Sequence, residues 1–146
     1  MEYKLTDFNH RIDVQLRFSD IDGFKHVNNS VFFEYFDLGR LNYIKDVLNL
    51  CISLNDEQSI VIASTKTDYI RSVYLWDSIA VYTKVYRLGN KSFRIVQWLV
   101  KSGEETPSVV CDSIMSGFVP SIEQSMPIPD KWRQKFNEFE KGTLIH

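Results

Sequence analysis

The stretch that decides the fold is residues 18–38, which read FSDIDGFKHVNNSVFFEYFDL. Two acids, a glycine, a histidine and two asparagines run directly into an apolar segment. Residues 30–48 contain no proline, and their apolar side chains recur at helical spacing, among them Phe32, Phe36, Tyr43 and Val47. We therefore predict one long helix over 30–48, with the polar stretch next to its positively polarised N-terminus.

Strand-like segments lie on both sides of this helix. Before it, RIDVQLRF at residues 11–18 alternates apolar and polar side chains, as a half-buried strand does. After it come four segments rich in β-branched and aromatic residues, at 59–70, 77–88, 92–101 and 108–119. This order predicts an α+β fold in which a five-stranded antiparallel sheet wraps around one long central helix.

The ends of the strands carry turn signals. Gly89-Asn90 predicts a hairpin turn with positive φ. Three prolines follow the last strand, and DKWRQKFNEFEK at residues 130–141 predicts a C-terminal helix with Asp130 as its N-cap. The sheet would keep an unpaired edge strand, so we expect a homo-oligomer, either a dimer or a dimer of dimers.

Composition favours one domain over residues 1–146, because 44% of the 146 residues are hydrophobic. The net charge of −2 gives no sign of a nucleic-acid or membrane partner. Cys51 and Cys111 form no CxxC motif, which argues against a disulfide framework or a zinc site. Without a signal-peptide core or a membrane-length apolar run, the chain is expected in the cytoplasm.

The acids of the opening stretch first suggest calcium. If Gly23 held the glycine position of an EF-hand loop, the first ligand would be Phe18, so the pattern fails. His26 has no second His or Cys nearby, and we expect neither a metal nor a cofactor. Asp20 is interpreted as a turn cap. Asp22 lies closer to the helix start, where backbone N–H groups gather, and is the stronger candidate for chemistry.

The remaining polar residues have structural interpretations as well. Asn28, Asn29 and Ser30 all suit an N-cap, although two asparagines and His26 exceed what one cap requires. His26 is a candidate for a direct role, against the alternative of an ordinary surface or core histidine. Arg40 lies in the apolar stripe, where an ion pair with Asp37 or another acid is preferred to substrate binding.

These residues carry a family resemblance. RFSDIDGFKHVNNSVFFEYFDLGRLNYI resembles the signature of hotdog-fold acyl-CoA thioesterases of the 4-hydroxybenzoyl-CoA thioesterase type, in which an acid-x-acid pair leads through GHVNN into the central helix. TDYIRSVYLWDSIAVYTKVYRLGNKSF and MPIPDKWRQKFNEFE resemble later parts of the same family. The resemblance covers most of the chain and implies a hotdog fold and thioester hydrolysis.

The resemblance also implies site residues. By position, Asp22 matches the catalytic aspartate of the family, and Asn29 occupies a position near the substrate that Asn or His often fills. Lys25 departs from the pattern, because the family usually has glycine directly before the histidine. A glycine there would permit a special backbone conformation or a close approach to the thioester, so lysine bears on activity more than on fold.

The local chemistry suits a thioester. The sequence has no GxSxG motif and no activated cysteine, so a carboxylate remains as base or nucleophile. Asp22 would attack the acyl carbon or deprotonate a water, helix-start N–H groups would stabilise the oxyanion, and Asn29 would orient water or thioester. A thiol with a pKa of about 8.5 leaves without a placed acid. Asn28, Val31, Phe32 and Tyr35 are candidate substrate contacts, or plain core in the case of the apolar ones.

Positive charge is concentrated between Ser59 and Lys101, with seven basic and two acidic residues. Arg87, Lys91 and Ser92 flank the Gly89-Asn90 turn and could hold phosphates, in a region that resembles a coenzyme A contact of the family. The alternative is an ordinary solvated hairpin. The expected partner is an acyl-CoA or an acyl carrier protein thioester. A non-catalytic acyl-thioester-binding or assembly module stays open, as does a hotdog dehydratase, which fits the motif less well.

Overall fold

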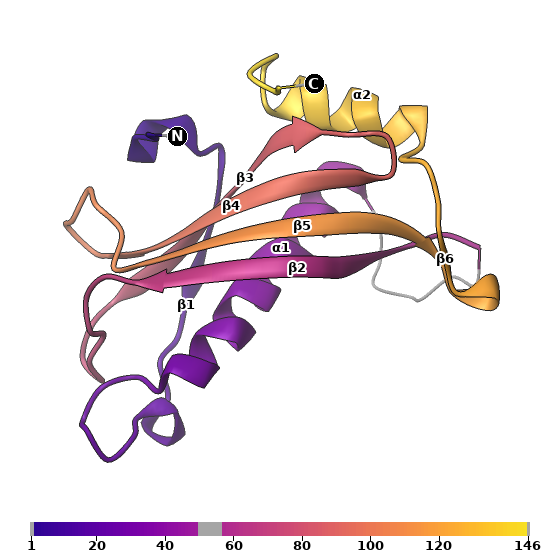
Figure 1. The fold of residues 1–146 in the computed structure, drawn as a ribbon. Helices are drawn as coiled ribbons and strands as arrows, with labels where there is room; N and C mark the ends of the chain where they lie inside the picture. Colours follow the sequence, from indigo (N-terminus) through magenta and orange to yellow (C-terminus); the bar gives the residue numbers. More distant parts are fainter. Residues whose placement is uncertain (1, 50–56, 146) are drawn as a thin grey trace.

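The structure, a computed structural model, describes residues 2–49 and 57–145. Five long strands form an antiparallel sheet that curls around a helix, as Figure 1 shows. The helix is α1 (Phe32–Leu48), and a second helix, α2 (Asp130–Phe139), lies near the C-terminus. The strands are β1 (His10–Val14), β2 (Ser59–Tyr69), β3 (Ile79–Leu88), β4 (Ser92–Lys101) and β5 (Val109–Val119).

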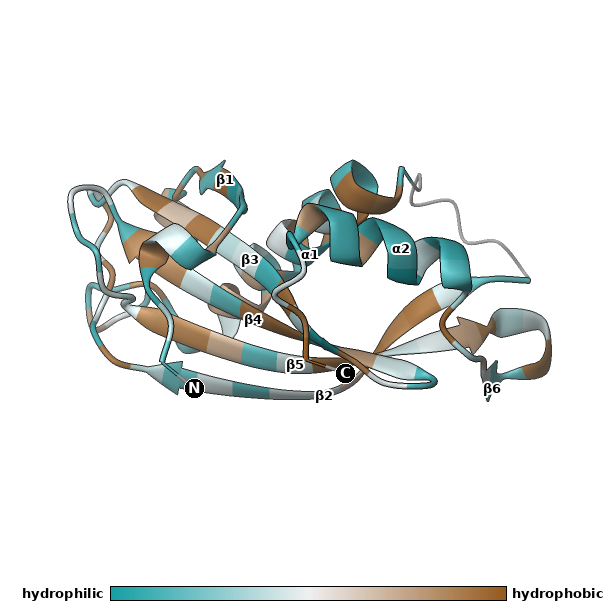
Figure 2. Cartoon of the chain, turned by 90° about the horizontal axis from the view of Figure 1, so that it is seen from above, coloured by the Kyte–Doolittle hydropathy of each residue, from teal (hydrophilic) through white to brown (hydrophobic). Residues whose placement is uncertain are grey.

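The strand order across the sheet is β1-β3-β4-β5-β2, which places β1 and β2 at the two edges. α1 and α2 both lie on the inner face, and Figure 2 shows the sheet curving beneath them. The predicted α+β hotdog architecture is therefore confirmed. Two residues form an additional short strand, β6 (Gln124–Ser125), which pairs with β5, so the sheet has six strands where five were predicted. The extra pair arises because the chain turns back immediately after β5.

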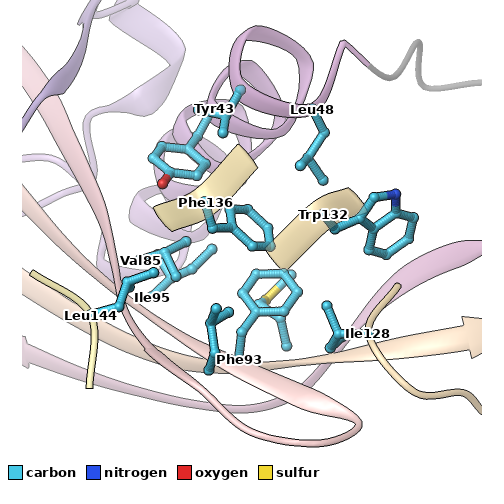
Figure 3. Packing of buried hydrophobic residues seen from close by; sticks show 12 residues of the cluster. Tyr43, Leu48, Val85, Phe93, Ile95, Ile128, Trp132, Phe136 and Leu144 are labelled. Carbon is cyan, nitrogen blue, oxygen red and sulfur yellow. The ribbon is translucent and has the colours of Figure 1, made fainter. Parts of the chain in front are cut away.

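The predicted stripe of α1 faces the sheet, and Phe32, Phe36, Tyr43 and Val47 are all buried. They belong to two apolar clusters at the two ends of the helix. The cluster at the C-terminal end packs α1 against α2 and the inner face of the sheet, with Phe93 and Phe136 in ring contact at 4.9 Å (Figure 3). Burying a large apolar side chain is worth about 1.5–3 kcal/mol, so this stripe anchors the helix.

A row of polar side chains separates the two clusters. Thr83, Gln97, Cys111 and Thr67 are paired across β3, β4, β5 and β2. The guanidinium of Arg40 donates to Gln97 Oε1 at 2.9 Å and pairs with Asp37, as the sequence predicted for the ion pair. Gly39 lies above this row, where a Cβ atom would come within 2.7 Å of Val81.

Several local predictions were wrong. β1 ends at Val14, and Phe18 is 82% exposed because the chain enters a 3-10 turn at Phe18–Asp20. Gly89 and Asn90 do not have positive φ, although the turn is closed as in a hairpin, with the Gly89 N–H donating to Ser92 O at 2.8 Å. Asp130 is the first residue of α2 and Pro129 is the N-cap, so Asp130 places its negative charge in the first turn, near the positive end of the helix dipole.

The outer face of the sheet is covered near the N-terminus, whereas the β2 edge is exposed. Near the N-terminus, Tyr3, Leu5 and Phe8 pack on the outer face of the sheet against Tyr86 and Trp98. β2 is largely uncovered, and every residue from 61 to 66 is exposed. Within the described ranges, no helix is both long and apolar enough to cross a membrane.

Candidate active site

The opening motif folds into a small hairpin directly before α1. Ile21 pairs with Val27, the Asp22 N–H donates to His26 O at 3.0 Å, and the Asn28 N–H donates to Asp20 O at 3.0 Å. The Val27 N–H then donates to Val73 O at 2.7 Å, which ties the hairpin to the loop before β3. In Figure 1 this hairpin lies at the lower left, beside the start of α1. Main-chain hydrogen bonds therefore hold residues 18–31 together and to the loop before β3.

Asp22 lies at the turn of this hairpin with its side chain 19% exposed. Its Oδ1 accepts the Phe24 N–H at 2.9 Å, which is a turn-capping bond. The same oxygen lies 3.8 Å from Nδ1 of His26, too far for a hydrogen bond but close enough for electrostatic interaction. A partly exposed carboxylate in this position can take a proton from a bound water or attack an electrophile.

His26 is partly exposed beside Asp22. Its Nδ1 lies 3.3 Å from Val27 O, and because a carbonyl oxygen only accepts, Nδ1 carries a proton in that contact. The Phe24 ring stacks on the imidazole at 6.0 Å, with 14° between the two planes. The structure therefore places His26 and Asp22, two candidate site residues, beside each other.

Lys25 adopts a positive φ of 68°. This is the left-handed region in which glycine is favoured, and it accounts for the preference for glycine at this position in the resemblance. The lysine is exposed, and its N–H still donates to Asp22 O at 3.0 Å, closing the turn. The substitution leaves the turn in place and adds backbone strain to it.

The asparagines at the helix start have different environments. Asn28 caps the 3-10 turn Asn29–Val31 that leads into α1: its Oδ1 accepts the Ser30 N–H at 3.0 Å and the Ser30 hydroxyl at 2.9 Å. Its main-chain oxygen accepts the Val31 N–H at 2.9 Å, so part of the helix start is already satisfied. Asn29 is exposed, and its carbonyl accepts the Tyr69 hydroxyl at 3.2 Å. Asp22 lies opposite His26 in the hairpin, and Asn28 is two residues further along the same backbone, a distance of about 7 Å.

Asp20 and Tyr35 form a contact that sequence reasoning missed. Tyr35, a candidate substrate contact, is buried and donates its hydroxyl to Asp20 Oδ2 at 2.6 Å, so the core interpretation describes it better. Burial, and then the Asp20 carboxylate, raises the pKa of Tyr35, which keeps its proton. Asp20 Oδ2 also accepts the Arg17 N–H at 3.1 Å, consistent with its predicted role as a turn cap. Val31 is half-buried at the edge of the same apolar cluster.

The basic hairpin lies at the other end of the molecule. β3 begins beside the loop that holds Val27 and ends at Leu88, so Arg87, Lys91 and Ser92 lie at the opposite end of the sheet from Asp22 (Figure 1). Arg133 of α2 donates to Gly89 O at 2.6 Å and to Asn90 O at 2.8 Å, fixing the turn. One chain therefore does not bring the two groups of predicted site residues together.

Ion pairs account for part of the positive charge between Ser59 and Lys101. Lys84 is buried and pairs with Glu140 at 3.1 Å. Lys101 pairs with Asp77 at 3.2 Å, and Arg71 lies 3.5 Å from Glu104. The charge available to a phosphate is therefore smaller than the sequence count indicates.

Two cavities lie away from the hairpin of Asp22. One, of about 620 Å³, lies between β1, β3 and the loops near Trp76 and Lys101. The other, of about 420 Å³, lies beneath Tyr3 on the outer face. Neither is lined by Asp22 or Asn29. Across residues 2–49 and 57–145, no group of three or more His, Cys, Asp or Glu side chains is placed to hold a metal. Cys111 is free and buried, and Cys51 lies outside the described residues.

Comparison with known sequences gives a consistent family. The family model described as the thioesterase-like superfamily matches residues 16–136. Over 141 residues the chain is 36% identical to the uncharacterized protein YsmA of Bacillus subtilis (strain 168), and the match spans 97% of this chain and 88% of YsmA. Both matches include the hairpin of Asp22 and α1.

Solved structures share the fold over nearly the whole chain. A thioesterase of Thermus thermophilus, solved in complex with coenzyme A and zinc, has a TM-score of 0.80 at 27% identity, covering 92% of this chain and 97% of that chain. A predicted thioesterase of Bacillus stearothermophilus has a TM-score of 0.78 at 27% identity, covering 88% and 94%. The PA5185 protein of Pseudomonas aeruginosa PAO1 has a TM-score of 0.84 at 22% identity, covering 93% and 94%.

Proposed function

Since the chain belongs to the thioesterase-like superfamily, we propose that it is an acyl-CoA thioesterase whose catalytic carboxylate is Asp22. One observation carries this proposal: a partly exposed carboxylate lies 3.8 Å from His26 Nδ1, on a hairpin that leads directly into the N-terminus of α1. The motif resemblance to the 4-hydroxybenzoyl-CoA thioesterase type supports the same assignment of Asp22 and Asn29.

The reaction would use few groups. Asp22 takes a proton from a water that attacks the acyl carbon, or attacks the acyl carbon itself to form an anhydride that water then hydrolyses. On either route the carbon–sulfur bond breaks, the coenzyme A sulfur leaves as a thiolate and the acyl group is released as the free acid. Asp22 Oδ1 already accepts one N–H, so Oδ2 is the oxygen that would act. His26 Nδ1, 3.8 Å from this carboxylate, would lie beside the reacting groups. No leaving-group acid is required, because a thiol with a pKa of about 8.5 departs as its anion.

The helix start would stabilise the oxyanion. Asn28 already takes the Ser30 N–H, so the stabilisation would come from the remaining donors and from the positive end of the helix dipole. The exposed Asn29 side chain would orient the water or the thioester. Val31 and Asn28 would contact the acyl part of the substrate. Tyr35 would not touch the substrate and would hold Asp20 through its hydroxyl.

A second copy of the chain would complete the site, so we also propose a cytoplasmic homodimer or a dimer of dimers. β2 is an eleven-residue edge strand that is open along most of its length. A two-fold axis beside β2 would reverse the partner sheet and bring its basic hairpin to the end that holds Asp22. Arg87, Lys91 and Ser92 of that hairpin would then be placed for coenzyme A phosphates. A monomeric mass by sedimentation at micromolar concentration would contradict this arrangement.

Release of free thiol tests the proposed activity. The protein is incubated with a panel of acyl-CoAs and a thiol reagent, and we expect turnover of at least one of them at a rate that scales with protein concentration. Activity in the presence of a chelator is expected as well, since no metal is part of the proposal. Binding of acyl-CoAs without thiol release would refute the hydrolase.

The alternative is an acyl-thioester-binding module without catalysis. One observation favours it: Asp22 already serves as a turn cap for Phe24, a role that requires no chemistry. In the same experiment this alternative predicts saturable binding and no thiol release above that of heat-treated protein.

A further inference from the structure

Two tyrosines on α1 make the same contact at opposite ends of the helix. Tyr35 donates its hydroxyl to Asp20 at 2.6 Å, and Tyr43 donates its hydroxyl to Glu140 at 2.6 Å. All four side chains are buried. The two contacts attach different segments to α1. Tyr43 binds the C-terminal segment through Glu140, and Tyr35 binds the opening motif through Asp20, two residues before Asp22.

The Glu140 contact belongs to the core alone. Glu140 also accepts from Lys84 at 3.1 Å and from the Val85 N–H at 3.1 Å, and Lys84 donates to Thr143 at 2.8 Å. These bonds fix the C-terminal segment against β3. They lie at the end of the sheet opposite to Asp22 (Figure 1).

Asp20, in contrast, connects three parts of the candidate site. Its carboxylate accepts from Tyr35 on α1 and from the Arg17 N–H in the turn before the hairpin. Its carbonyl accepts the Asn28 N–H, which closes the hairpin on the side of the helix start. Asp20 therefore links the turn before the hairpin, the hairpin itself and α1.

The charge on Asp20 makes the Tyr35 hydroxyl important. The carboxylate lies beside an apolar cluster that includes Val27, Phe32 and Phe36. Arg17 Nε is 3.9 Å away on a side chain that is 68% exposed, which makes it a weak partner. A charge-assisted hydrogen bond from a buried donor is the stronger interaction, and losing it leaves a buried carboxylate with one donor fewer.

We propose that Tyr35 and Asp20 are positioning residues that hold the Asp22 hairpin at a fixed distance from the start of α1. This inference rests on the proposed function for its effect on turnover. The physical claim about the hairpin is independent of that function, because it concerns the order of residues 20–28. A displacement of about 1 Å between a catalytic group and its substrate can lower a rate by up to about 10²-fold.

The test compares Tyr35→Phe with Tyr43→Phe, which removes the same hydroxyl from the same helix at the same hydrogen-bond distance. Both variants should melt at a lower temperature than the wild type. We expect kcat per folded molecule to fall about ten-fold or more in Tyr35→Phe, with little change in KM, and to stay near wild type in Tyr43→Phe. Equal effects of the two variants on kcat would overturn the proposal.

Amide hydrogen exchange supplies a readout that needs no activity. In Tyr35→Phe the exchange of the Asp22, Val27 and Asn28 amides should accelerate about ten-fold, while in Tyr43→Phe these amides should stay protected. Unchanged protection in Tyr35→Phe would overturn the positioning role, even for a protein without turnover. Absence of wild-type turnover combined with the expected exchange pattern would refute the proposed function alone.

Asp20→Asn is the conservative variant. It keeps an oxygen that can accept from Tyr35 and from the Arg17 N–H, and it removes the charge. We expect Asp20→Asn to keep the slow amide exchange of the hairpin and most of kcat. Asp20→Ala, which removes the acceptor, should behave like Tyr35→Phe. If Asp20→Ala left exchange and kcat at wild-type levels, the role of Asp20 would be rejected.

Discussion

Lys25 combines a strained backbone conformation with a hydrogen bond that closes the turn of Asp22. Its φ of 68° costs a non-glycine residue about 1 kcal/mol, yet its N–H closes the turn that presents Asp22. The Lys25 side chain is exposed. The strain at this position is therefore a property of the backbone of the hairpin and not of a packing contact.

Replacing Lys25 by glycine should relieve this strain. We expect Lys25→Gly to raise the free energy of unfolding by up to about 1 kcal/mol, because the gain in the folded state exceeds the entropy added to the unfolded chain. Urea unfolding measures this free energy, provided that the slope m is the same for the variant and the wild type. Lys66→Gly, in the extended backbone of β2, is the control and should be destabilising. A loss of stability in Lys25→Gly equal to that of Lys66→Gly would contradict the account.

At the scale of elements, the polar row beneath α1 sets the register of the helix on the sheet. Gln97 is central to it: its Nε2 donates to Phe36 O at 3.0 Å and to Thr83 at 3.1 Å, and its Oε1 accepts from Arg40. Gln97 is fully buried, and its bonds join α1 to β3 and β4. The row fixes where along the sheet α1 lies, and hence where its N-terminus meets the hairpin.

Removing the amide of Gln97 should therefore be costly. We expect Gln97→Leu to lower the free energy of unfolding by about 2–4 kcal/mol, because Arg40 and Phe36 O lose buried partners. Gln134→Leu, on the exposed side of α2, is the control and should stay within about 0.5 kcal/mol of the wild type. Chemical denaturation of the three proteins gives the comparison. A cost below about 1 kcal/mol for Gln97→Leu would show that water replaces its bonds.

The elements themselves were largely predictable because each has a local cause. Periodic apolar residues predicted α1 to within two residues, and β4 begins and ends where the sequence indicated. The exposure of Phe18 could not be foreseen, because alternation continues in the sequence after the strand has ended at Val14. The bonds from Arg133 of α2 to the Gly89-Asn90 turn join distant segments, which a local turn signal does not indicate.

The candidate site was predictable where its residues are neighbours in sequence. Asp22 and His26 share one hairpin, and a local motif can indicate that. The bond from Tyr35 to Asp20 spans fifteen residues and two elements, so the sequence left Tyr35 open between a substrate contact and the core. The separation of Arg87 from Asp22 follows from the strand order, which a sequence pattern does not specify.

At the scale of the whole molecule, the two groups of candidate site residues lie at opposite ends of the sheet. The hairpin of Asp22 lies at one end, and α2 with the basic hairpin lies at the other (Figure 1). In the proposed dimer each site would combine the Asp22 end of one chain with the basic hairpin of its partner. The uncovered β2 edge is the surface that would make this combination.

Charge reversal tests this combination. We expect Arg87→Glu with Lys91→Glu to raise KM for coenzyme A thioesters more than KM for short thioesters without a nucleotide, since only the former carry phosphates. The same two-charge change at Lys131 and Lys141, both exposed near α2, is the control and should affect neither. Equal effects on both substrate types would show that the hairpin has no part in binding coenzyme A.

The central claim is that Asp22 is the catalytic carboxylate, and Asp22→Asn tests it most directly. The amide keeps the shape and the capping bond to Phe24 but cannot act as base or nucleophile. Asp77→Asn is the matched control, because Asp77 caps its own turn by accepting the Tyr74 N–H at 2.8 Å. Its side chain is also partly exposed.

The measurement is kcat together with the melting temperature of the same preparations. The account predicts that Asp22→Asn lowers kcat by about 10²-fold or more while the protein stays folded and binds acyl-CoA. Asp77→Asn should lose about 0.5–2 kcal/mol of stability at most and keep kcat near wild type. If Asp22→Asn kept wild-type turnover per folded molecule, Asp22 would be a turn cap only, and the catalytic assignment would be contradicted.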